Sequence, residues 1–241
     1  MKDYRAYVGP KESYDLISAE QFTLLTTLGL RDHHYLLDLG CGSLRAGRLF
    51  IPYLLPGHYY GIEPNQWLIE EGLGNEIGES ILQVKKPTFS NDSNFTLSTF
   101  GRNFDFVIAN SIFTHASKDS IQTCLYEGKK VMKKESIFAA TIRFGEEDYE
   151  EKEWVYPRGI DYTEKTISKM IHAAGLSYVK MAWRHYSRKQ TWLGIVNPGN
   201  EKAVEGYYDY FRMRNRLQRI ETNPLLKLGI KAYTLRAARR K

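Results

Sequence analysis

Hydrophobic and polar residues follow two distinct patterns along the chain as far as about residue 200. Short, continuous hydrophobic runs are typical of buried strands. Five such runs lie at 35–39, 59–63, 87–90, 104–109 and 136–142. Apolar residues at helical spacing predict helices at 14–28, 45–55, 118–132 and 163–174. Another helix begins near Asn65, and Gly72, Gly74 and Gly78 are expected to break it.

Two further hydrophobic runs, at 178–183 and 190–196, resemble a final hairpin. Strands that alternate with helices favour a sheet whose strands are mostly parallel and covered on both faces. The pattern therefore predicts an α/β domain with a seven-stranded, mostly parallel sheet and helices on both faces.

The composition changes near residue 200. Residues 207–241 contain ten Lys or Arg and two Asp or Glu, so this tail alone makes the chain basic, with a net charge of +6. We therefore expect one domain over 1–200 and a basic, helical C-terminal extension over 201–241. The mixture of apolar and cationic residues in 225–241 predicts a basic amphipathic helix. Three partners remain open for it: the domain itself, an anionic membrane surface, and RNA.

The overall composition narrows the class of protein. With 42% hydrophobic and 13% aromatic residues, the chain has enough apolar material for a full core. No apolar run approaches the roughly 20 residues of a membrane span, and 1–14 lacks the apolar stretch of a signal peptide. Cys41 and Cys124 form no CxxC pattern, and there is no HExxH, so no disulfide framework or metal site is predicted. We expect a cytoplasmic protein, with peripheral attachment to the inner membrane surface as an alternative.

The first motif with chemical meaning follows the run at 35–39. Residues 38–45 read DLGCGSLR, which predicts a strand, a glycine-containing loop and the start of a helix. Gly40 and Gly42 allow the backbone to approach a ligand closely, and a helix N-terminus favours anionic groups. A plain strand-to-helix turn is the alternative interpretation. Cys41 is expected to be a small residue at the edge of the core, because nothing nearby in sequence would activate it as a nucleophile.

Polar residues follow three more strands. Glu63 ends the second strand, 25 residues after Asp38, where an acid accepts hydrogen bonds from both hydroxyls of a ribose. Asp92 follows the third strand and suits an adenine amino group, although a plain loop acid is the alternative. Asn110 and Ser111 end the run at 104–109, where open α/β sheets bind ligands.

Together these stretches resemble the class I S-adenosylmethionine-dependent methyltransferases. LLDLGCG, YYGIEP and FDFVIANSIFTH match that family in order and spacing, and the resemblance covers about residues 35–196. It implies a Rossmann-like fold and S-adenosylmethionine as cofactor. The implied cofactor-binding residues are Asp38, Gly40, Cys41, Gly42, Arg45, Glu63, Pro64, Asp92, Asn110 and Ser111. The chain departs from the family at Leu44, where many members have a third glycine.

Two related classes of enzyme fit less well. A nicotinamide-dependent dehydrogenase needs G-x-G-x-x-G, whereas this chain has Arg45 at the third glycine position. Enzymes that methylate amino groups of DNA bases usually have an Asn or Asp after the fourth strand that is followed by two prolines. Here Asn110 is followed by Ser111 and Ile112. DNA is therefore not an expected partner, whereas RNA is not excluded.

Candidate catalytic and acceptor-binding residues lie in later loops. His115, five residues past Asn110, is the best candidate for a general base, with a purely structural role as the alternative. The irregular segment 146–161 has the length of a lid, and the N-terminal Tyr4 and Tyr7 are weaker candidates for closing the cofactor pocket. The predicted acceptor-binding residues are Trp154, Tyr156, Arg158 and His185.

These expectations combine into one predicted function. The chain is predicted to transfer a methyl group to a hydroxyl of a small molecule or glycan precursor. The alternatives are an RNA methyltransferase that uses the basic tail and a non-catalytic cofactor-binding scaffold. The sequence indicates no oligomeric state.

Overall fold

The core of the fold is a seven-stranded sheet with the strand order β3-β2-β1-β4-β5-β7-β6. It is seen in a computed structural model that describes residues 3–206. The strands are β1 (Leu36–Leu39), β2 (Tyr59–Ile62), β3 (Thr88–Ser90), β4 (Phe104–Ala109), β5 (Met132–Ile142), β6 (Ser177–Arg184) and β7 (Thr191–Val196). The first five strands are parallel to one another, and β7 is antiparallel to both β5 and β6. The predicted α/β fold and its final hairpin are confirmed.

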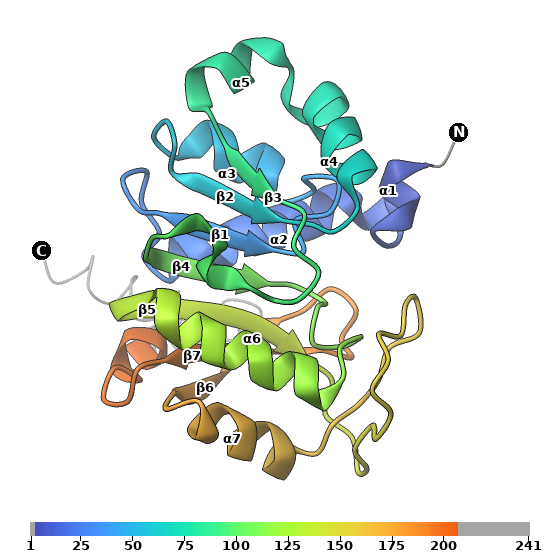
Figure 1. Cartoon of the computed structure of the whole chain (residues 1–241), viewed down its shortest axis with the longest axis vertical. Coiled ribbons are helices and arrows are strands. Elements are labelled where there is room, and N and C mark those ends of the chain that lie inside the picture. The colour runs from blue at the N-terminus through green and yellow to red at the C-terminus, as the bar shows by residue number, and fades with distance from the viewer. Residues whose placement is uncertain (1–2, 207–241) are drawn as a thin grey trace, which may run out of the picture. The chain divides into compact units, whose positions relative to one another are not determined.

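The register places the ends of the central strands side by side. Asp38 in β1 pairs with Gly61 in β2 and with Ile108 in β4. The residues that follow these strands therefore meet at one edge of the sheet, the carboxyl edge. This edge lies on the right of Figure 1, where α1 (Tyr4–Tyr7) and the segment 146–161 also lie.

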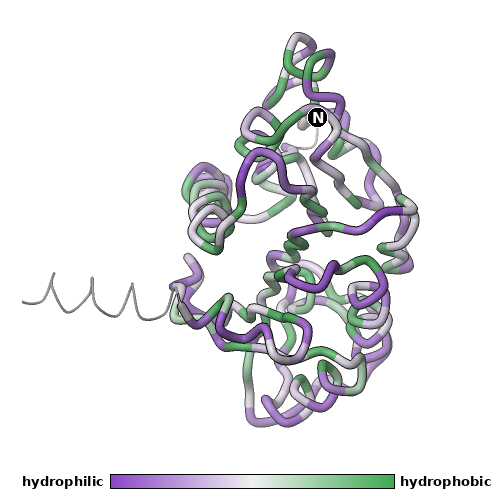
Figure 2. The backbone as a smooth tube through the Cα atoms, turned by 90° about the vertical axis from the view of Figure 1, so that its left-hand side faces the viewer, coloured by the Kyte–Doolittle hydropathy of each residue, from purple (hydrophilic) through white to green (hydrophobic). Residues whose placement is uncertain are grey.

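Helices in two groups flank the sheet. One group contains α2 (Tyr14–Thr27), α3 (Gly47–Tyr53) and α5 (Glu79–Lys85), and α3 contacts both of the others. The other contains α6 (Lys118–Val131) and α7 (Glu164–Ala173), which pack against each other. The helix α4 (Gln66–Gly72) contacts α1. Figure 2 shows hydrophobic and hydrophilic stretches alternating along the helices, as expected of helices with one buried face.

Alternation along the strands explains the sheet's two buried faces. Leu37 and Leu39 in β1 and Val107 in β4 belong to one large hydrophobic cluster, which also contains residues of α6 and α7. Their neighbours Leu36 and Ile108 are equally buried but lie outside this cluster. Continuous hydrophobic runs such as FDFVIA therefore mark strands covered on both faces.

Side-chain caps fix where two of the predicted helices begin. Ser117 Oγ accepts a hydrogen bond from the backbone N–H of Ser120 (3.3 Å), which caps α6. Thr163 Oγ1 accepts from the N–H of Thr166 (3.2 Å), which caps α7. Each cap satisfies a backbone donor that the first helical turn leaves unpaired.

The region around α4 differs from the prediction. Gly72 ends α4 without breaking the helical path, because a π-helical turn (Leu73–Ile77) continues from it and includes Gly74. A Cβ at Gly72 would lie 2.5 Å from the carbonyl oxygen of Ser43, so this glycine permits close packing. Gly78, with φ of +82°, follows the π-helical turn, and α5 then forms where no helix was predicted.

The basic tail lies outside the described residues, apart from 201–206. The predictions for 207–241, namely an amphipathic helix and its membrane, RNA or domain partner, therefore stay predictions, as does the boundary at residue 200. Within the part that is described, no helix is long and apolar enough to cross a membrane.

Candidate active site

The loop after β1 is built from residues with left-handed backbone conformations. Gly40 and Gly42 have φ of +69° and +55°, and Leu44 has φ of +60°. Because Leu44 turns the chain, α3 begins at Gly47 and not at Arg45 as predicted. The backbone N–H groups of Gly40 and Cys41 both donate to the carbonyl of Ile62 (2.8 and 3.1 Å), which holds the loop against β2.

Both glycines are covered closely by side chains from other segments. A Cβ on Gly40 would lie 2.1 Å from Cδ1 of Ile112, and one on Gly42 would lie 2.8 Å from Cγ1 of Val8. Only a residue without a side chain permits these approaches. The loop is therefore a cradle that the segment after β4 and the N-terminal segment cover.

Glu63 joins the glycine loop to the end of β2. Its buried carboxylate accepts from the N–H of Gly42 through Oε2 (3.2 Å). Oε1 accepts from the backbone N–H and the side-chain amide of Asn65 (2.9 and 2.7 Å). Pro64, exposed between them, has no polar side-chain atom. The Asn91 amide donates to the carbonyl of Glu63 (2.8 Å), which brings the loop after β3 to the same place.

Asp92 is held by its own loop. Its Oδ2 accepts from the N–H groups of Asn94 (2.9 Å) and Thr96 (2.8 Å), the pattern of a carboxylate that stabilises a turn. These bonds support the plain-loop alternative for Asp92, and its contact with adenine stays a prediction.

Asp38 is buried beneath the glycine loop. Burial raises the pKa of its carboxyl group to about 6, although the Tyr59 hydroxyl donates to Oδ2 at 2.7 Å and lowers it in part. Arg45 lies near enough to lower this pKa as well. Its Nη1 donates to the carbonyl of Val8 (2.6 Å), and its buried Nε has no hydrogen-bond partner.

Asn110 and Ser111 meet the β6–β7 loop at the end of β4. His185 Nε2 donates to Oδ1 of Asn110 (3.1 Å), and the buried Nδ2 of Asn110 has no partner. Burial lowers the pKa of His185 to about 4, so the imidazole is neutral near pH 7. The Gln190 amide donates to the Ser111 hydroxyl (3.0 Å). No sequence signal indicated either pairing, since the Asn110–His185 pair is 75 residues apart.

His115 anchors the segment that was predicted to be a lid. Its Nδ1 lies 2.9 Å from the carbonyl oxygen of Val155 and 3.0 Å from that of Arg158, so Nδ1–H donates to both. With Nδ1 as the donor, Nε2 carries the lone pair of the neutral ring, and it has no hydrogen-bond partner within residues 3–206. Burial lowers the pKa of His115 below its ordinary value, which favours this neutral form.

Aromatic side chains connect the lid to the N-terminus. The Tyr156 hydroxyl donates to the carbonyl of Tyr7, and the Tyr7 ring lies 5.1 Å from that of Trp67 in α4. The His115 ring lies 5.1 Å from the Tyr156 ring and 5.7 Å from that of Trp154, which is half exposed. Tyr7 was a weak candidate for closing this site. Trp67 was missed because the sequence pattern indicated only that it belongs to a helix.

The other two N-terminal and lid candidates lie elsewhere. The Tyr4 hydroxyl donates to Oε1 of Glu76 (2.9 Å), which also receives an ion pair from Arg5 (2.6 Å) and so fixes α1 to the π-helical turn. Arg158 is exposed and contributes its carbonyl oxygen to His115. Among the described side chains, no three His, Cys, Asp or Glu residues are placed to hold a metal ion.

Solved structures identify the fold. The magnesium protoporphyrin IX methyltransferase from Synechocystis PCC 6803, with bound S-adenosylmethionine, aligns with a TM-score of 0.57 and 16% identity over 80% of this chain and 89% of that one. The fold is that of S-adenosylmethionine-dependent methyltransferases. Such a methyltransferase from Clostridium acetobutylicum ATCC 824 aligns with a TM-score of 0.57 and 14% identity, over 76% of this chain and 92% of that one.

The CcbJ methyltransferase from Streptomyces caelestis has the same fold, with a TM-score of 0.55 and 12% identity over 81% of this chain and 99% of that one. No protein-family model and no curated protein sequence matches the chain. At these identities the comparisons establish the fold alone.

Proposed function

We propose that this protein is an S-adenosylmethionine-dependent methyltransferase. One observation carries the proposal: Asp38, the Gly40–Gly42 loop, Glu63 and Asn110 converge at the carboxyl edge of a sheet with the methyltransferase strand order. Open α/β sheets bind their ligands at this edge, where the strand order reverses. The solved structures with this fold include complexes with S-adenosylmethionine and S-adenosylhomocysteine.

The residues at this edge fit such a cofactor. The two left-handed glycines present backbone without side chains, which Ile112 and Val8 cover, and buried polar atoms of Asn110, Thr114 and Arg45 lack partners. Unsatisfied buried donors and acceptors are costly unless a ligand or water completes them. Val8 and Ile112 lie over the glycines, so we propose that both side chains shift when the cofactor binds.

Each residue then has a definite part in holding the cofactor. Asp38 offers a carboxylate to the methionine amino group, and Glu63 offers the remaining lone pair of Oε2 to a ribose hydroxyl. Asn110 donates through Nδ2, and Arg45 through Nε. The bound cofactor supplies an electrophilic methyl group on a sulfonium.

We infer that the acceptor is a hydroxyl of a small molecule or glycan precursor. Nε2 of His115 carries the free lone pair of a neutral imidazole. A base with such a lone pair can remove the proton of a hydroxyl group. The lid residues Trp154 and Tyr156 flank this ring. One solved structure with this fold is a glycopeptide N-methyltransferase, which supports a glycan-related acceptor.

Titration calorimetry with S-adenosylmethionine and S-adenosylhomocysteine tests the cofactor proposal. We expect binding of both, and a folded protein that binds neither would contradict the proposal. Transfer of a radioactive methyl group to components of a cell extract tests catalysis, since a non-catalytic scaffold would transfer none. Nuclease treatment of the extract separates the acceptors, because loss of labelling would indicate RNA instead of a small molecule.

A further inference from the structure

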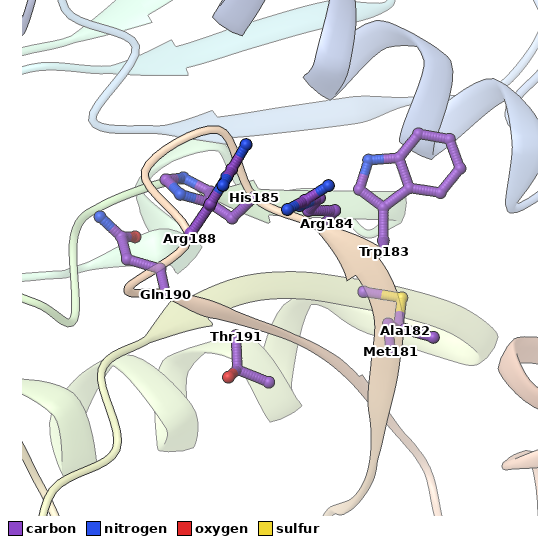
Figure 3. Close-up of a pocket in the computed structure, with 8 residues that line it drawn as sticks. All are labelled: Met181, Ala182, Trp183, Arg184, His185, Arg188, Gln190 and Thr191. Atoms are coloured by element: carbon purple, nitrogen blue, oxygen red, sulfur yellow. The ribbon is translucent and has the colours of Figure 1, made fainter.

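A second feature of the carboxyl edge is a pocket at the β6–β7 loop. It has a volume of about 480 Å³, within the range of small-molecule sites. Figure 3 shows its lining residues on the final hairpin, and the polar ones include Arg184, His185, Arg188, Gln190 and Thr191. None of the contacts described above for the cofactor residues uses Arg184 or Arg188.

The two charged residues that line the pocket are both arginines, Arg184 and Arg188. The hairpin from Ser177 to Val196 contains no Asp or Glu. Lys180, which is not a lining residue of the pocket, pairs with Glu164 at 2.8 Å. Neither Arg184 nor Arg188 pairs with any carboxylate in the described part of the chain. Both side chains are exposed, and each guanidinium offers several N–H donors to an anion in the pocket.

Arg188 occupies a position that suits an arginine poorly. Its φ is +57°, in the left-handed region where Gly or Asn causes less strain. Its N–H donates to the carbonyl of His185 (2.9 Å), so the left-handed residue closes a tight turn. The turn alone does not require a cation. The long cationic side chain at this place lines the pocket.

The same pocket borders the proposed methyl-transfer site. β5 and β6 are both antiparallel to β7, so the end of β6 lies at the carboxyl edge together with the end of β4. Two lining residues reach the end of β4 directly: His185 bonds to Asn110 (3.1 Å) and Gln190 bonds to Ser111 (3.0 Å). A molecule in the pocket therefore contacts His185 and Gln190, which are hydrogen-bonded to Asn110 and Ser111 after β4.

We propose that this pocket binds an oxyanion of the methyl acceptor, with Arg184 and Arg188 as its ligands. The inference rests on the proposed function, and it narrows the acceptor to a compound that carries a phosphate or carboxylate group. Arginine binds both groups through paired N–H donors. Gln190 and Thr191 add uncharged hydrogen-bonding groups to the lining.

Calorimetry on the full chain at 0.15 M NaCl tests the proposal with three probes: glucose 1-phosphate, glucuronate and glucose. We expect one or both of the anionic sugars to bind and glucose not to bind, and the pair of anions identifies which oxyanion is preferred. Arg184→Gln and Arg188→Asn should each weaken that binding about 10-fold or more. Asn tolerates the left-handed backbone at position 188, so the fold is retained.

Lys189→Gln is the matched control. Lys189 lies in the same loop with the same charge but does not line the pocket, and we expect its substitution to change affinity less than about twofold. The proposal is overturned if neither anion binds, if glucose binds equally well, or if all three variants weaken binding alike. Binding that survives both arginine substitutions also overturns it. Affinity for S-adenosylhomocysteine, measured on the same proteins, reports separately on the proposed function.

Discussion

Nε2 of His185 lies 3.1 Å from the side-chain oxygen of Asn110 and donates a hydrogen bond to it. Since Ser187 Oγ contacts the other ring nitrogen (2.8 Å), both nitrogens of His185 are occupied. The bond fixes which way the Asn110 amide is turned, so its NH₂ group is directed away from His185 and remains buried without a partner. His185 is therefore a positioning residue in the proposed site, acting through Asn110.

Substitution of His185 should weaken cofactor binding only when the donor is lost. His185→Gln keeps an N–H that can reach Asn110, whereas His185→Leu leaves the amide oxygen buried without a donor. We expect affinity for S-adenosylhomocysteine to fall about 5- to 20-fold in the Leu variant and about twofold or less in the Gln variant. Calorimetry on the two variants checks this. Equal losses would show that the size of His185 matters and its hydrogen bond does not.

The buried His185 should also make the fold sensitive to acid. Its pKa of about 4 in the folded protein lies below the value near 6.5 in an unfolded chain. As the pH falls from 6.5 to 4, the unfolded chain takes up the proton first, so the free energy of unfolding decreases, on the order of 3 kcal/mol for this group. Urea titrations between pH 7.5 and 4 should show a shallower decrease for His185→Gln. Parallel curves for the two proteins would contradict the assignment.

How far the sequence predicts this molecule depends on the range of the interactions. FDFVIA predicted β4 at Phe104–Ala109 with the bounds observed, because a strand buried on both faces is recorded locally as a hydrophobic run. Gly40 and Gly42 likewise marked the loop after β1, and their left-handed backbone is a finding of the structure. The pairing of Asn110 with His185 depends on how the last hairpin meets β4, and no local pattern records that. The prediction that Gly72 breaks the helix was wrong for a related reason. Gly72 allows Ser43, in a loop distant in sequence, to pack closely against it.

Glu63 provides a direct test of the ribose assignment. Glu63→Ala should cost about 1.5–3 kcal/mol of cofactor affinity, the range for hydrogen bonds to a charged group. Part of that loss would come from the glycine loop, since the N–H of Gly42 loses its acceptor. Glu135→Ala, at an exposed residue near the start of β5, is the control and should leave affinity unchanged. Calorimetry with S-adenosylhomocysteine measures both, and equal affinities would remove Glu63 from the site.

The Asp38 carboxylate is expected to lower the stability of the fold and to strengthen cofactor binding. Its folded-state pKa of about 6 lies above the unfolded value, so its contribution to stability is present at low pH and is lost as the pH rises through 6. Asp38→Asn should therefore raise the free energy of unfolding at pH 7.5, on the order of 1–3 kcal/mol, while weakening cofactor binding. Urea denaturation and calorimetry measure the two effects.

The control for Asp38 is Asp105, an aspartate whose pKa is shifted in the opposite direction. Burial alone would raise the pKa of Asp105, but hydrogen bonds from Lys133 (2.7 Å) and from the N–H of Tyr35 (2.8 Å) bring it below its ordinary value. Asp105→Asn should therefore destabilise the protein at pH 7.5 and leave cofactor affinity intact. If Asp38→Asn destabilises the fold as well, then the hydrogen bonds to the Asp38 carboxylate outweigh the cost of burying it, and the raised pKa of Asp38 is contradicted.

His115 has two separable roles, because its two ring nitrogens do different things. Nδ1 holds the carbonyl oxygens of Val155 and Arg158, and Nε2 is the proposed base. The amide of His115→Asn can donate from near the position of Nδ1 but offers no base. We expect this variant to keep its cofactor affinity and to lose about 10²–10⁴-fold in turnover, the usual contribution of a general base.

The rate of the wild-type enzyme should then depend on pH in a defined direction. Since burial lowers the pKa of His115 from 6.5, the rate should rise with pH on the acid side, reach half its plateau below pH 6.5, and stay level near pH 7. His115→Asn should lack this acid limb. If the Asn variant instead retains full turnover, while His115→Leu loses both activity and protection of residues 146–161 from proteolysis, then His115 serves to anchor the lid, and a hydroxyl acceptor must be deprotonated by another group.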